Sequence, residues 1–438
     1  MKHALPLALA AALLASTAAP ALAQAPASAA AVRVTPAQTT ALLAAIKKEV
    51  RDRYVFPDRR DAIIKALDAA QAAGRYAVAD PFELASRIGS DLESSSRDKH
   101  MGLAWSPPQY AAAVARPTGP ADAEDAFWRN EAIRRNSGLV EQKILPGNVR
   151  YVKLAAFLWQ DDLSPIAYDG AMRFLAGGDA AIIDLRGNGG GDPAAVSYLT
   201  SHFLPPDQLL VSFHMGAATP DLSKTATRPA GRITAPLYVL IDGGVASAGE
   251  EFAYHVEQFK LGELIGKTTA GAANRNETVP IAPGFMFSIS VGRPEHPVSK
   301  TNWEGVGVPP AVETAPAKAL DVALARALAK LETSAAPADK ARYAWARADA
   351  AARAEPVALT SPAAAYAGRF GEAAVESSGD QLVLRLPGRL AARLTPLGPD
   401  LFAIEDSVRR ARFVRNGGAV TGLELLRENG EVKAYPKG

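Results

Sequence analysis

The chain has 438 residues, of which 48% are hydrophobic and 21% are charged, a composition typical of a soluble globular protein with two or three domains. Its formal net charge is +2, so there is no basic excess that would indicate nucleic-acid binding. Cysteine is absent, which excludes disulfides, thiolate metal sites, a cysteine nucleophile and a lipid-modified N-terminal cysteine.

The N-terminus has the pattern of a secretory signal. Lys2 precedes a short apolar run, Leu5–Ala15, and the tripeptide Ala-Leu-Ala before Gln24 fits a cleavage site. The run is too short to span a membrane, and no later segment has the length and apolarity of a span. We therefore predict a signal peptide over residues 1–23, a disordered Ala-rich segment over 24–34, and a periplasmic or secreted protein without an integral membrane segment after cleavage.

Residues 35–98 show three helical patterns and predict an N-terminal helical unit. The first pattern begins with Thr35 as cap, followed by proline, and its leucines, isoleucine and valine recur at helical spacing. The second runs near Arg60–Ala73. The third opens at Asp80, again with proline in the first turn and with glutamate three residues after the cap.

Residues 99–332 predict a mixed α/β core. The stretches DAAIIDLRG (179–187) and PLYVLIDGG (236–244) are apolar runs that lead into glycines and then into helical sequence. Such runs are typical of strands buried on both faces. Because strands alternate with helices, we expect parallel strands joined by crossover connections.

The remainder changes character twice. Ala-rich sequence predicts a helical linker over residues 333–362. Over residues 363–438, short β-like runs are separated by turn signals such as Asn416-Gly417. We predict a small antiparallel β domain there, with a stabilising or partner-binding role, because it contains no histidine and no obvious catalytic residues.

Ser247 opens the stretch SAGE and allows two interpretations. Ser247 and Glu250 satisfy the capping-box pattern, which favours a structural role at a helix start. The same position, a sharp strand-to-helix turn, also suits a nucleophile, and the helix N-terminus offers unpaired N–H groups to a developing oxyanion. A serine nucleophile needs a base, because its free hydroxyl reacts poorly.

The chain has six histidines that could supply this base. His255 lies two turns along the helix that Ser247 begins, roughly 12 Å away at 1.5 Å per residue, which is too far. His100 lies in the polar stretch RDKHMG after a helix, where loops often carry function. One histidine belongs to the signal, and three lack an indicative local context: His202, His214 and His296.

The stretch DLRGNGGGDP (184–193) places three glycines after a buried strand. Their N–H groups could form an anion-binding nest or half of an oxyanion hole. A Walker motif is absent, because no Gly-Lys-Ser/Thr follows, and the spacing does not fit a dinucleotide fingerprint. The sequence has no His-x-x-x-His motif and no cluster of histidine and carboxylates at metal-ligand spacing, so we predict no cofactor and no metal.

Four motifs occur in a fixed order downstream of DKH: AIIDLRGNGGG, VLIDGGVASAGEEF, LIGKTTAGAAN and NWEGVGVPP. As a set they resemble the tail-specific, or C-terminal processing, serine peptidases, in the branch related to tricorn core protease and to interphotoreceptor retinoid-binding protein. The resemblance covers roughly Leu92–Val312. It implies an α/β fold with a crotonase-like ββα superhelix core behind an N-terminal helical unit. The sequence between His100 and Asp179 leaves no room for the PDZ insert of many members.

The resemblance assigns roles to particular residues. Ser247 matches the nucleophile, and the backbone N–H of Ala248 would supply one oxyanion donor. Gly189 or Gly190 would supply the other. The better-known branch uses a lysine base, but Ala272 stands at that position.

The tricorn-like branch uses a histidine base and a downstream glutamate, which match His100 and Glu304. In tricorn a serine precedes the histidine and links it to the glutamate, and here that residue is Lys99. Glu304 would therefore orient His100 directly, through water or by pairing with Lys99.

The sequence thus predicts an exported serine peptidase that acts on peptide or protein substrates, close to their C-termini, through an acyl-enzyme. The alternative is a non-proteolytic binding protein for retinoids or fatty acids on the same scaffold, since fold alone does not fix function. An acyl-CoA enzyme of the crotonase type agrees less well with a signal peptide.

Overall fold

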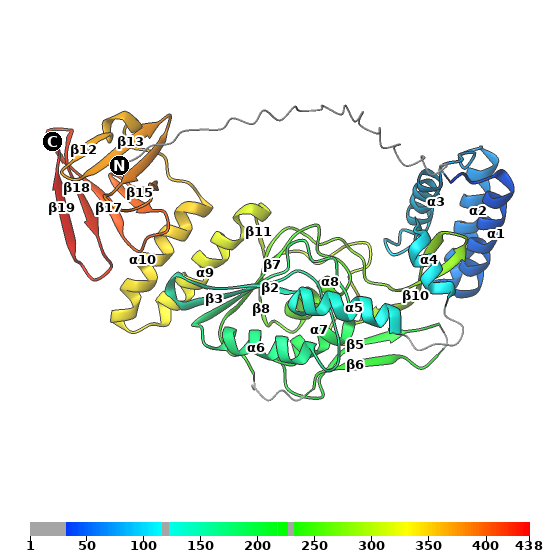
Figure 1. The fold of residues 1–438 in the computed structure, drawn as a ribbon. Coiled ribbons are helices and arrows are strands. Elements are labelled where there is room, and N and C mark those ends of the chain that lie inside the picture. The colour runs from blue at the N-terminus through cyan, green and yellow to red at the C-terminus, as the bar shows by residue number, and fades with distance from the viewer. Residues whose placement is uncertain (1–31, 116–121, 217, 227–231) are drawn as a thin grey trace, which may run out of the picture.

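A computed structural model describes residues 32–115, 122–216, 218–226 and 232–438 (Figure 1). The predicted signal peptide and most of the predicted disordered segment lie outside these residues. Within the described part of the chain, no helix combines the length and apolarity needed to cross a membrane. The strands of the described residues form three sheets, and helices cover the two that precede the C-terminal part.

The N-terminal unit contains the three predicted helices, α1 (Pro36–Arg53), α2 (Arg60–Ala72) and α3 (Pro81–Ser96). The predicted caps are formed: the side chain of Thr35 accepts the N–H of Gln38, and that of Asp80 accepts the N–H of Glu83. The apolar faces of these helices do not pack only on one another. They also bury side chains of a distant hairpin, among them Phe285, Phe287 and Ile289.

That hairpin belongs to the first sheet, in which every pairing is antiparallel. The strand order is β1–β10–β5–β6, and β9 also pairs with β10. Leu103 of β1 lies opposite Phe287 of β10, so the strand that follows α3 packs against the N-terminal hydrophobic core. The strands are β1 (Gly102–Trp105), β5 (Leu209–His214), β6 (Asp221–Lys224), β9 (Arg275–Ala282) and β10 (Phe285–Glu295).

The second sheet has the order β11–β8–β7–β4–β3–β2, and all neighbours except β2 and β3 are parallel. All five residues of β4 and of β7 are buried, which confirms the predicted strands. The crossover architecture is also confirmed; the crotonase-like superhelix remains a prediction. The strands are β2 (Leu139–Leu145), β3 (Val149–Leu154), β4 (Ala180–Asp184), β7 (Leu237–Ile241), β8 (Gly262–Gly266) and β11 (Val312–Glu313).

Helices cover both faces of this sheet. Alternate strand residues point to opposite sides, and since all residues of β4 and β7 are buried, both sides have apolar side chains to cover. One face packs on α6, α7 and α8, and the other on α9 and α10. The helices are α4 (Pro107–Val114), α5 (Asp122–Arg134), α6 (Ser164–Ala176), α7 (Pro193–Thr200), α8 (Ala248–Gln258), α9 (Ala319–Ser334) and α10 (Pro337–Ala354).

Helix α10 differs from the linker that the sequence predicts over 333–362. Its alanines Ala346 and Ala350 are buried in the same cluster as Ala323 and Ala327 of α9. Small side chains let the two helices approach closely and let α10 share the core that lies over the sheet. Most of the predicted linker is therefore part of the packed structure.

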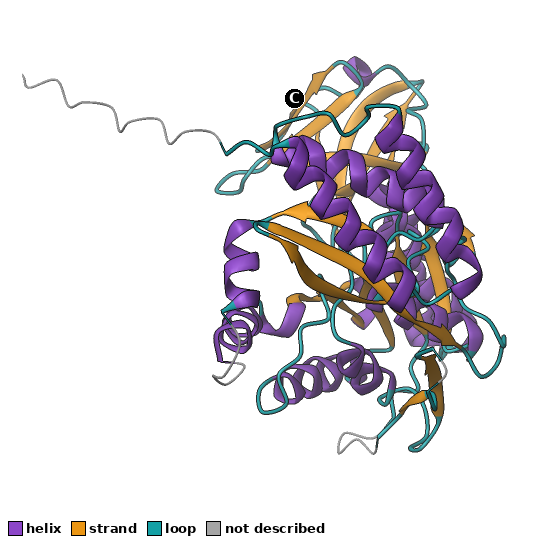
Figure 2. Ribbon diagram, turned by 90° about the vertical axis from the view of Figure 1, so that its right-hand side faces the viewer, coloured by secondary structure: helices purple, strands orange, loops and turns teal. Residues whose placement is uncertain are grey.

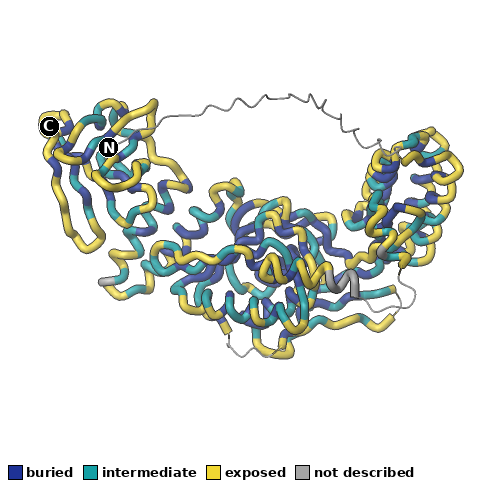
Figure 3. Tube along the Cα trace, viewed as in Figure 1, coloured by how far each residue is buried: buried dark blue, intermediate teal, exposed yellow. Residues whose placement is uncertain are grey.

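The third sheet confirms the predicted antiparallel β domain. Its eight strands follow one another in sequence order, and Phe370 of the first strand also bridges to Lys437 beyond the last. Figure 2 shows these strands gathered around the C-terminus, and Figure 3 shows that each part of the molecule has its own buried interior. The strands are β12 (Gly368–Phe370), β13 (Ala373–Ser378), β14 (Gln381–Arg385), β15 (Ala392–Gly398), β16 (Leu401–Ile404), β17 (Arg410–Asn416), β18 (Ala419–Leu426) and β19 (Val432–Pro436).

Candidate active site

Ser247 stands at the turn between β7 and α8, directly before the first helical residue, Ala248. Its backbone has φ 52° and ψ −123°, a conformation that residues with a side chain rarely adopt. Gly190 packs against it: a Cβ on Gly190 would lie 2.7 Å from the Ser247 Cβ and 3.0 Å from the Ala248 nitrogen. The predicted nucleophile and the predicted glycine turn are therefore in direct contact.

The predicted oxyanion donors differ in their hydrogen bonds. Gly190 donates its N–H to the side-chain oxygen of Asn188 at 2.9 Å, and its carbonyl accepts the N–H of Phe157 at the same distance. The N–H groups of Gly189 and Ala248 have no hydrogen-bond partner among the described residues. Of the two glycines, Gly189 thus has the available donor, whereas Gly190 provides the space beside Ser247.

Glu250 ties the nucleophile turn to a second loop. Its carboxylate is buried and accepts the N–H of Ser247 at 3.1 Å, as the capping box predicts. It also accepts the hydroxyl of Thr269 at 2.5 Å and the N–H groups of Gly271 at 2.6 Å and Ala272 at 2.8 Å. Ala272, which replaces the lysine of the other branch, is therefore held through its backbone.

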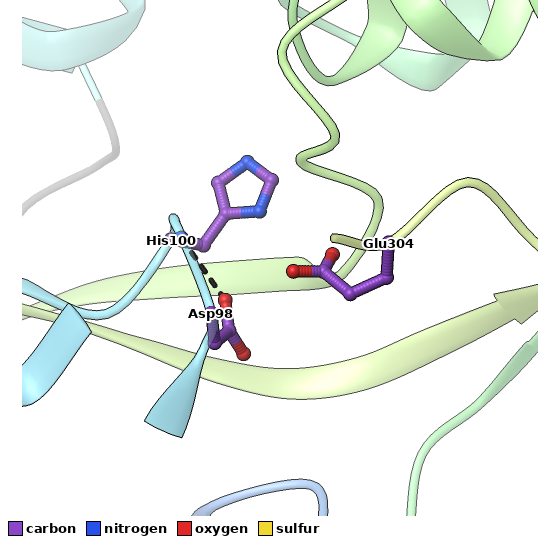
Figure 4. Close-up of side chains that lie close together, drawn as sticks. All are labelled: Asp98, His100 and Glu304. Atoms are coloured by element: carbon purple, nitrogen blue, oxygen red, sulfur yellow. Dashed lines mark hydrogen bonds between the residues drawn. The ribbon is translucent and has the colours of Figure 1, made fainter. Parts of the chain in front are cut away.

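The predicted base and its predicted partner lie together with a third residue, Asp98. One ring nitrogen of His100 and one carboxylate oxygen each of Asp98 and Glu304 lie within 4.8 Å of one another. Figure 4 shows the His100 ring and the Glu304 carboxylate facing each other, with Asp98 beside the His100 backbone. The pairing of β1 with β10 fixes this position, and the Ser288 hydroxyl donates to the His100 carbonyl at 2.6 Å.

One carboxylate oxygen of Glu304 accepts hydrogen bonds, and the other has no hydrogen-bond partner among the described residues. Its Oε2 accepts the N–H groups of Ala273 at 2.6 Å and Asn274 at 2.9 Å. Its Oε1 and the Nδ1 of His100 are buried, and among the described residues neither has a hydrogen-bond partner. These two atoms are suited to share a proton once the side chains approach.

Both members of this pair have shifted pKa values. Burial and the nearby charge of Asp98 raise the pKa of Glu304 to about 7. Burial lowers the pKa of His100, although the charge of Asp98 opposes this shift. Each shift disfavours the charged form, and for Glu304 the change of protonation falls close to neutral pH.

Asp98 is the site residue that sequence reasoning missed. It is fully buried and accepts the backbone N–H of His100 at 3.0 Å, the Asn274 side-chain amide at 2.9 Å and the Tyr54 hydroxyl at 3.3 Å. The Asp of the DKH motif was the available signal. Nothing local distinguishes this residue from a surface acid, since its partners come from distant segments.

Lys99 points elsewhere. Its exposed amine donates to the carbonyl of Ala270, and no ion pair between Lys99 and Glu304 occurs in the described part of the chain. Of the three couplings left open by the sequence, the structure thus lacks the one through Lys99. Lys267, the other lysine near this motif, pairs with Glu313 at 2.7 Å.

The site consists of two clusters that one loop connects. Glu250 binds the loop at residues 269–272 and Glu304 binds it at residues 273–274. No hydrogen bond between Ser247 and His100 is present among the described residues. The structure therefore brings together Ser247, the predicted nucleophile, with the glycine turn, and His100 with Glu304, while no hydrogen bond joins these two pairs among the described residues.

The other histidine near Ser247 is inside the protein. His255 is fully buried beside Glu251, with 3.5 Å between the His255 Nε2 and a Glu251 oxygen, and its ring centroid lies 5.3 Å from that of His296. Burial lowers the pKa of each of these two histidines to about 3. Both are therefore neutral packing residues at ordinary pH.

The same cluster offers one imidazole and two carboxylates to a cation. Asp98, His100 and Glu304 are donors of the kind that bind Zn²⁺, although the sequence predicts no metal. Local spacing could not reveal the set, because Glu304 is far from the other two in sequence.

Two family models match this chain. The model described as peptidase family S41 matches residues 148–314, and that of the N-terminal domain of S41 peptidases in eukaryotic IRBP matches residues 22–130. Together they span more than half of the sequence. The chain belongs to peptidase family S41. This confirms the family expected from the four motifs and the assignment as a serine-type peptidase.

Solved structures similar to this S41 chain include three with low sequence identity. The photosystem II D1 C-terminal processing protease is 17% identical with a TM-score of 0.41, and 65% of this chain covers 94% of it. A putative peptidase from Parabacteroides merdae is 18% identical with a TM-score of 0.47, and the match covers 68% of this chain and 99% of that structure. The tricorn protease is 13% identical with a TM-score of 0.39, and the match covers 65% of this chain and 35% of the tricorn chain. The family assignment rests on the two family models.

Proposed function

We propose that this S41 protein is an exported peptidase that cleaves peptide bonds through Ser247, His100 and Glu304, near the C-termini of its substrates. The observation that carries the proposal is the conformation of Ser247. A serine with φ 52° at a helix start, pressed against Gly190, is a strained arrangement that a simple helix cap does not require. Strain of this kind is concentrated at functional sites.

The reaction would follow the serine-peptidase scheme. The Ser247 hydroxyl attacks the substrate carbonyl while His100 takes its proton, and the N–H groups of Ala248 and Gly189 stabilise the oxyanion. His100 then donates the proton to the departing amine, and water hydrolyses the acyl-enzyme. Catalytic hydrogen bonds often tighten only when substrate binds, so approach of His100 to Ser247 is part of this proposal.

Glu304 and Asp98 have separate tasks in this scheme. Ionised Glu304 stabilises the imidazolium that forms on His100, as the third member of a triad does. Asp98 holds the His100 backbone and the Asn274 side chain in position. Export is supported by the N-terminal sequence pattern, and the crotonase-like class of the core by the resemblance of the motifs.

A fluorophosphonate probe combined with peptide hydrolysis tests the proposal. We expect the probe to label wild type but not Ser247→Ala, and His100→Ala to lower hydrolysis by about a thousandfold or more. Lys267→Ala is the matched control, because this exposed lysine pairs with the exposed Glu313 and with no residue of the candidate site; it should keep wild-type rates. Equal labelling of Ser247→Ala would refute the nucleophile. Retinoid or fatty-acid binding without any hydrolysis would favour the non-proteolytic alternative.

A further inference from the structure

A cavity of about 230 Å³ lies next to the nucleophile turn and takes no part in the scheme above. It is formed by the start of α7, the hairpin β5–β6 and the first residue of β9; α7 and β6 lie side by side in Figure 1 and are joined by a 2.6 Å hydrogen bond between Ser197 and Ser223. The side chains that matter for its chemistry are Asp192, Ser197, Phe213, Asp221, Ser223 and Arg275.

The chain connects this cavity to both halves of the candidate site. Asp192 is two residues after Gly190, which touches Ser247. Arg275, which also lines the cavity, directly follows Asn274, whose N–H holds Glu304. The cavity is therefore lined by residues that adjoin both halves of the candidate site in the chain.

The charges of the cavity do not cancel. Arg275 pairs with Asp221 at 3.2 Å and lies 5.7 Å from the centre of the Phe213 ring. Asp192 accepts the N–H of Ala194 at 2.8 Å as the cap of α7, but it has no cationic partner among the described residues. One negative charge remains unpaired on the wall that adjoins the glycine turn.

We propose that this cavity is a substrate subsite for a cationic side chain, lysine or arginine, next to the scissile bond; the assignment rests on the proposed peptidase function. The Asp192 carboxylate pairs with the cation, and the Phe213 ring offers it a favourable face. The serine hydroxyls accept hydrogen bonds from its N–H groups. An acidic side chain would meet the unpaired Asp192, while Arg275 is already neutralised by Asp221.

Cleavage of a peptide library by the full-length protein, read by mass spectrometry, tests the substrate class. We expect lysine or arginine to be enriched at one position beside the cleaved bond. Two peptides that differ only there, lysine against norleucine, then give a ratio of kcat/KM values. Because this is a ratio, it does not depend on the amount of folded enzyme in each preparation.

Asp192→Asn removes the charge and keeps the helix cap, since asparagine caps as well as aspartate. We expect the lysine-to-norleucine ratio to fall about tenfold, the scale of one hydrogen bond to a charged group. Asp162→Asn, an exposed aspartate that pairs with Arg129 outside the cavity, should leave the ratio unchanged.

The outcomes separate the two proposals. Cleavage without basic enrichment, a preference for acidic side chains, or an unchanged ratio in Asp192→Asn would overturn the subsite while leaving the peptidase intact. Absence of cleavage of every peptide by wild type, together with absence of probe labelling at Ser247, would remove the peptidase function itself and the subsite with it.

Discussion

The nucleophile turn and the base cluster of this S41 protein are built in opposite ways. Ser247 sits in a strand-to-helix turn beside Gly190, and the Glu250 carboxylate that accepts its N–H has four hydrogen-bond donors, three of them from residues 269–272. His100 and Glu304 come from segments far apart in sequence, and each leaves a buried polar atom unpartnered among the described residues. The side chain of Glu250 is fully hydrogen-bonded in the first half, whereas side-chain atoms of His100 and Glu304 keep free hydrogen-bonding capacity in the second.

The packing around Ser247 can be disturbed by a substitution at Gly190. In Gly190→Ala the new Cβ would lie 2.7 Å from the Ser247 Cβ and 3.0 Å from the Ala246 carbonyl oxygen, and φ at this position is 107°, a region that favours glycine. Ser247 must therefore shift. We expect hydrolysis to fall by about a hundredfold or more, since displacements near 1 Å have such effects, with a lower melting temperature. Probe labelling and calorimetry measure both effects.

Gly189→Ala is the matched control within the same turn. A Cβ at Gly189 would meet no atom within 4 Å, and its φ is outside the positive region. Because the substitution keeps the backbone N–H, we expect activity within a few-fold of wild type. Equal damage from both variants would show that the turn tolerates no change at all and would contradict the specific role of Gly190.

The base cluster can be tested through pH. Glu304 has a pKa of about 7, so it ionises as the pH rises through neutrality, and only the ionised form stabilises a protonated His100. We expect kcat/KM of wild type to rise with pH around a midpoint near 7. Glu304→Gln should lower the rate by about a hundredfold or more and move the midpoint below 6.5, where burial places His100.

The conservative variant Glu304→Asp separates charge from geometry. It retains an ionisable carboxylate, so the rising limb should persist even where the shorter side chain lowers the rate. A midpoint near 7 that survives in Glu304→Gln would mean that another group controls the profile and that Glu304 only positions the loop at residues 273–274.

The contrast also explains what could be predicted from sequence. The turn at Ser247 and the buried strands β4 and β7 follow from local rules, because caps, glycines and apolar runs are set by neighbouring residues. The base cluster depends on the pairing of β1 with β10, which joins His100 to Ser288 across 188 positions. No periodicity encodes this pairing, so the roles of His100 and Glu304 came from the family resemblance and that of Asp98 was missed. The burial of Phe285 under the N-terminal helices and the docking of α10 escaped for the same reason.

The smallest expected effect concerns Glu251, the neighbour of Glu250 in the first turn of α8. Both are buried, but no hydrogen bond reaches the Glu251 Oε1 from any described residue. Burial and then the charge of Asp192 raise the Glu251 pKa to about 8 from an ordinary value of 4.5.

Between these two pH values the folded protein holds a proton on Glu251 that the unfolded chain releases, so this group lowers stability as pH rises from 4.5 to 8. Glu251→Gln should match wild type in melting temperature near pH 5 and exceed it by a few degrees above pH 8. Glu257→Gln, less buried on the same helix, should show no such divergence. If Glu251→Gln instead destabilises equally at both pH values, the Glu251 carboxyl has a partner that matters in its neutral form. The carboxyl groups of Glu250 and Glu251 would then both be fully hydrogen-bonded in the first turn of α8.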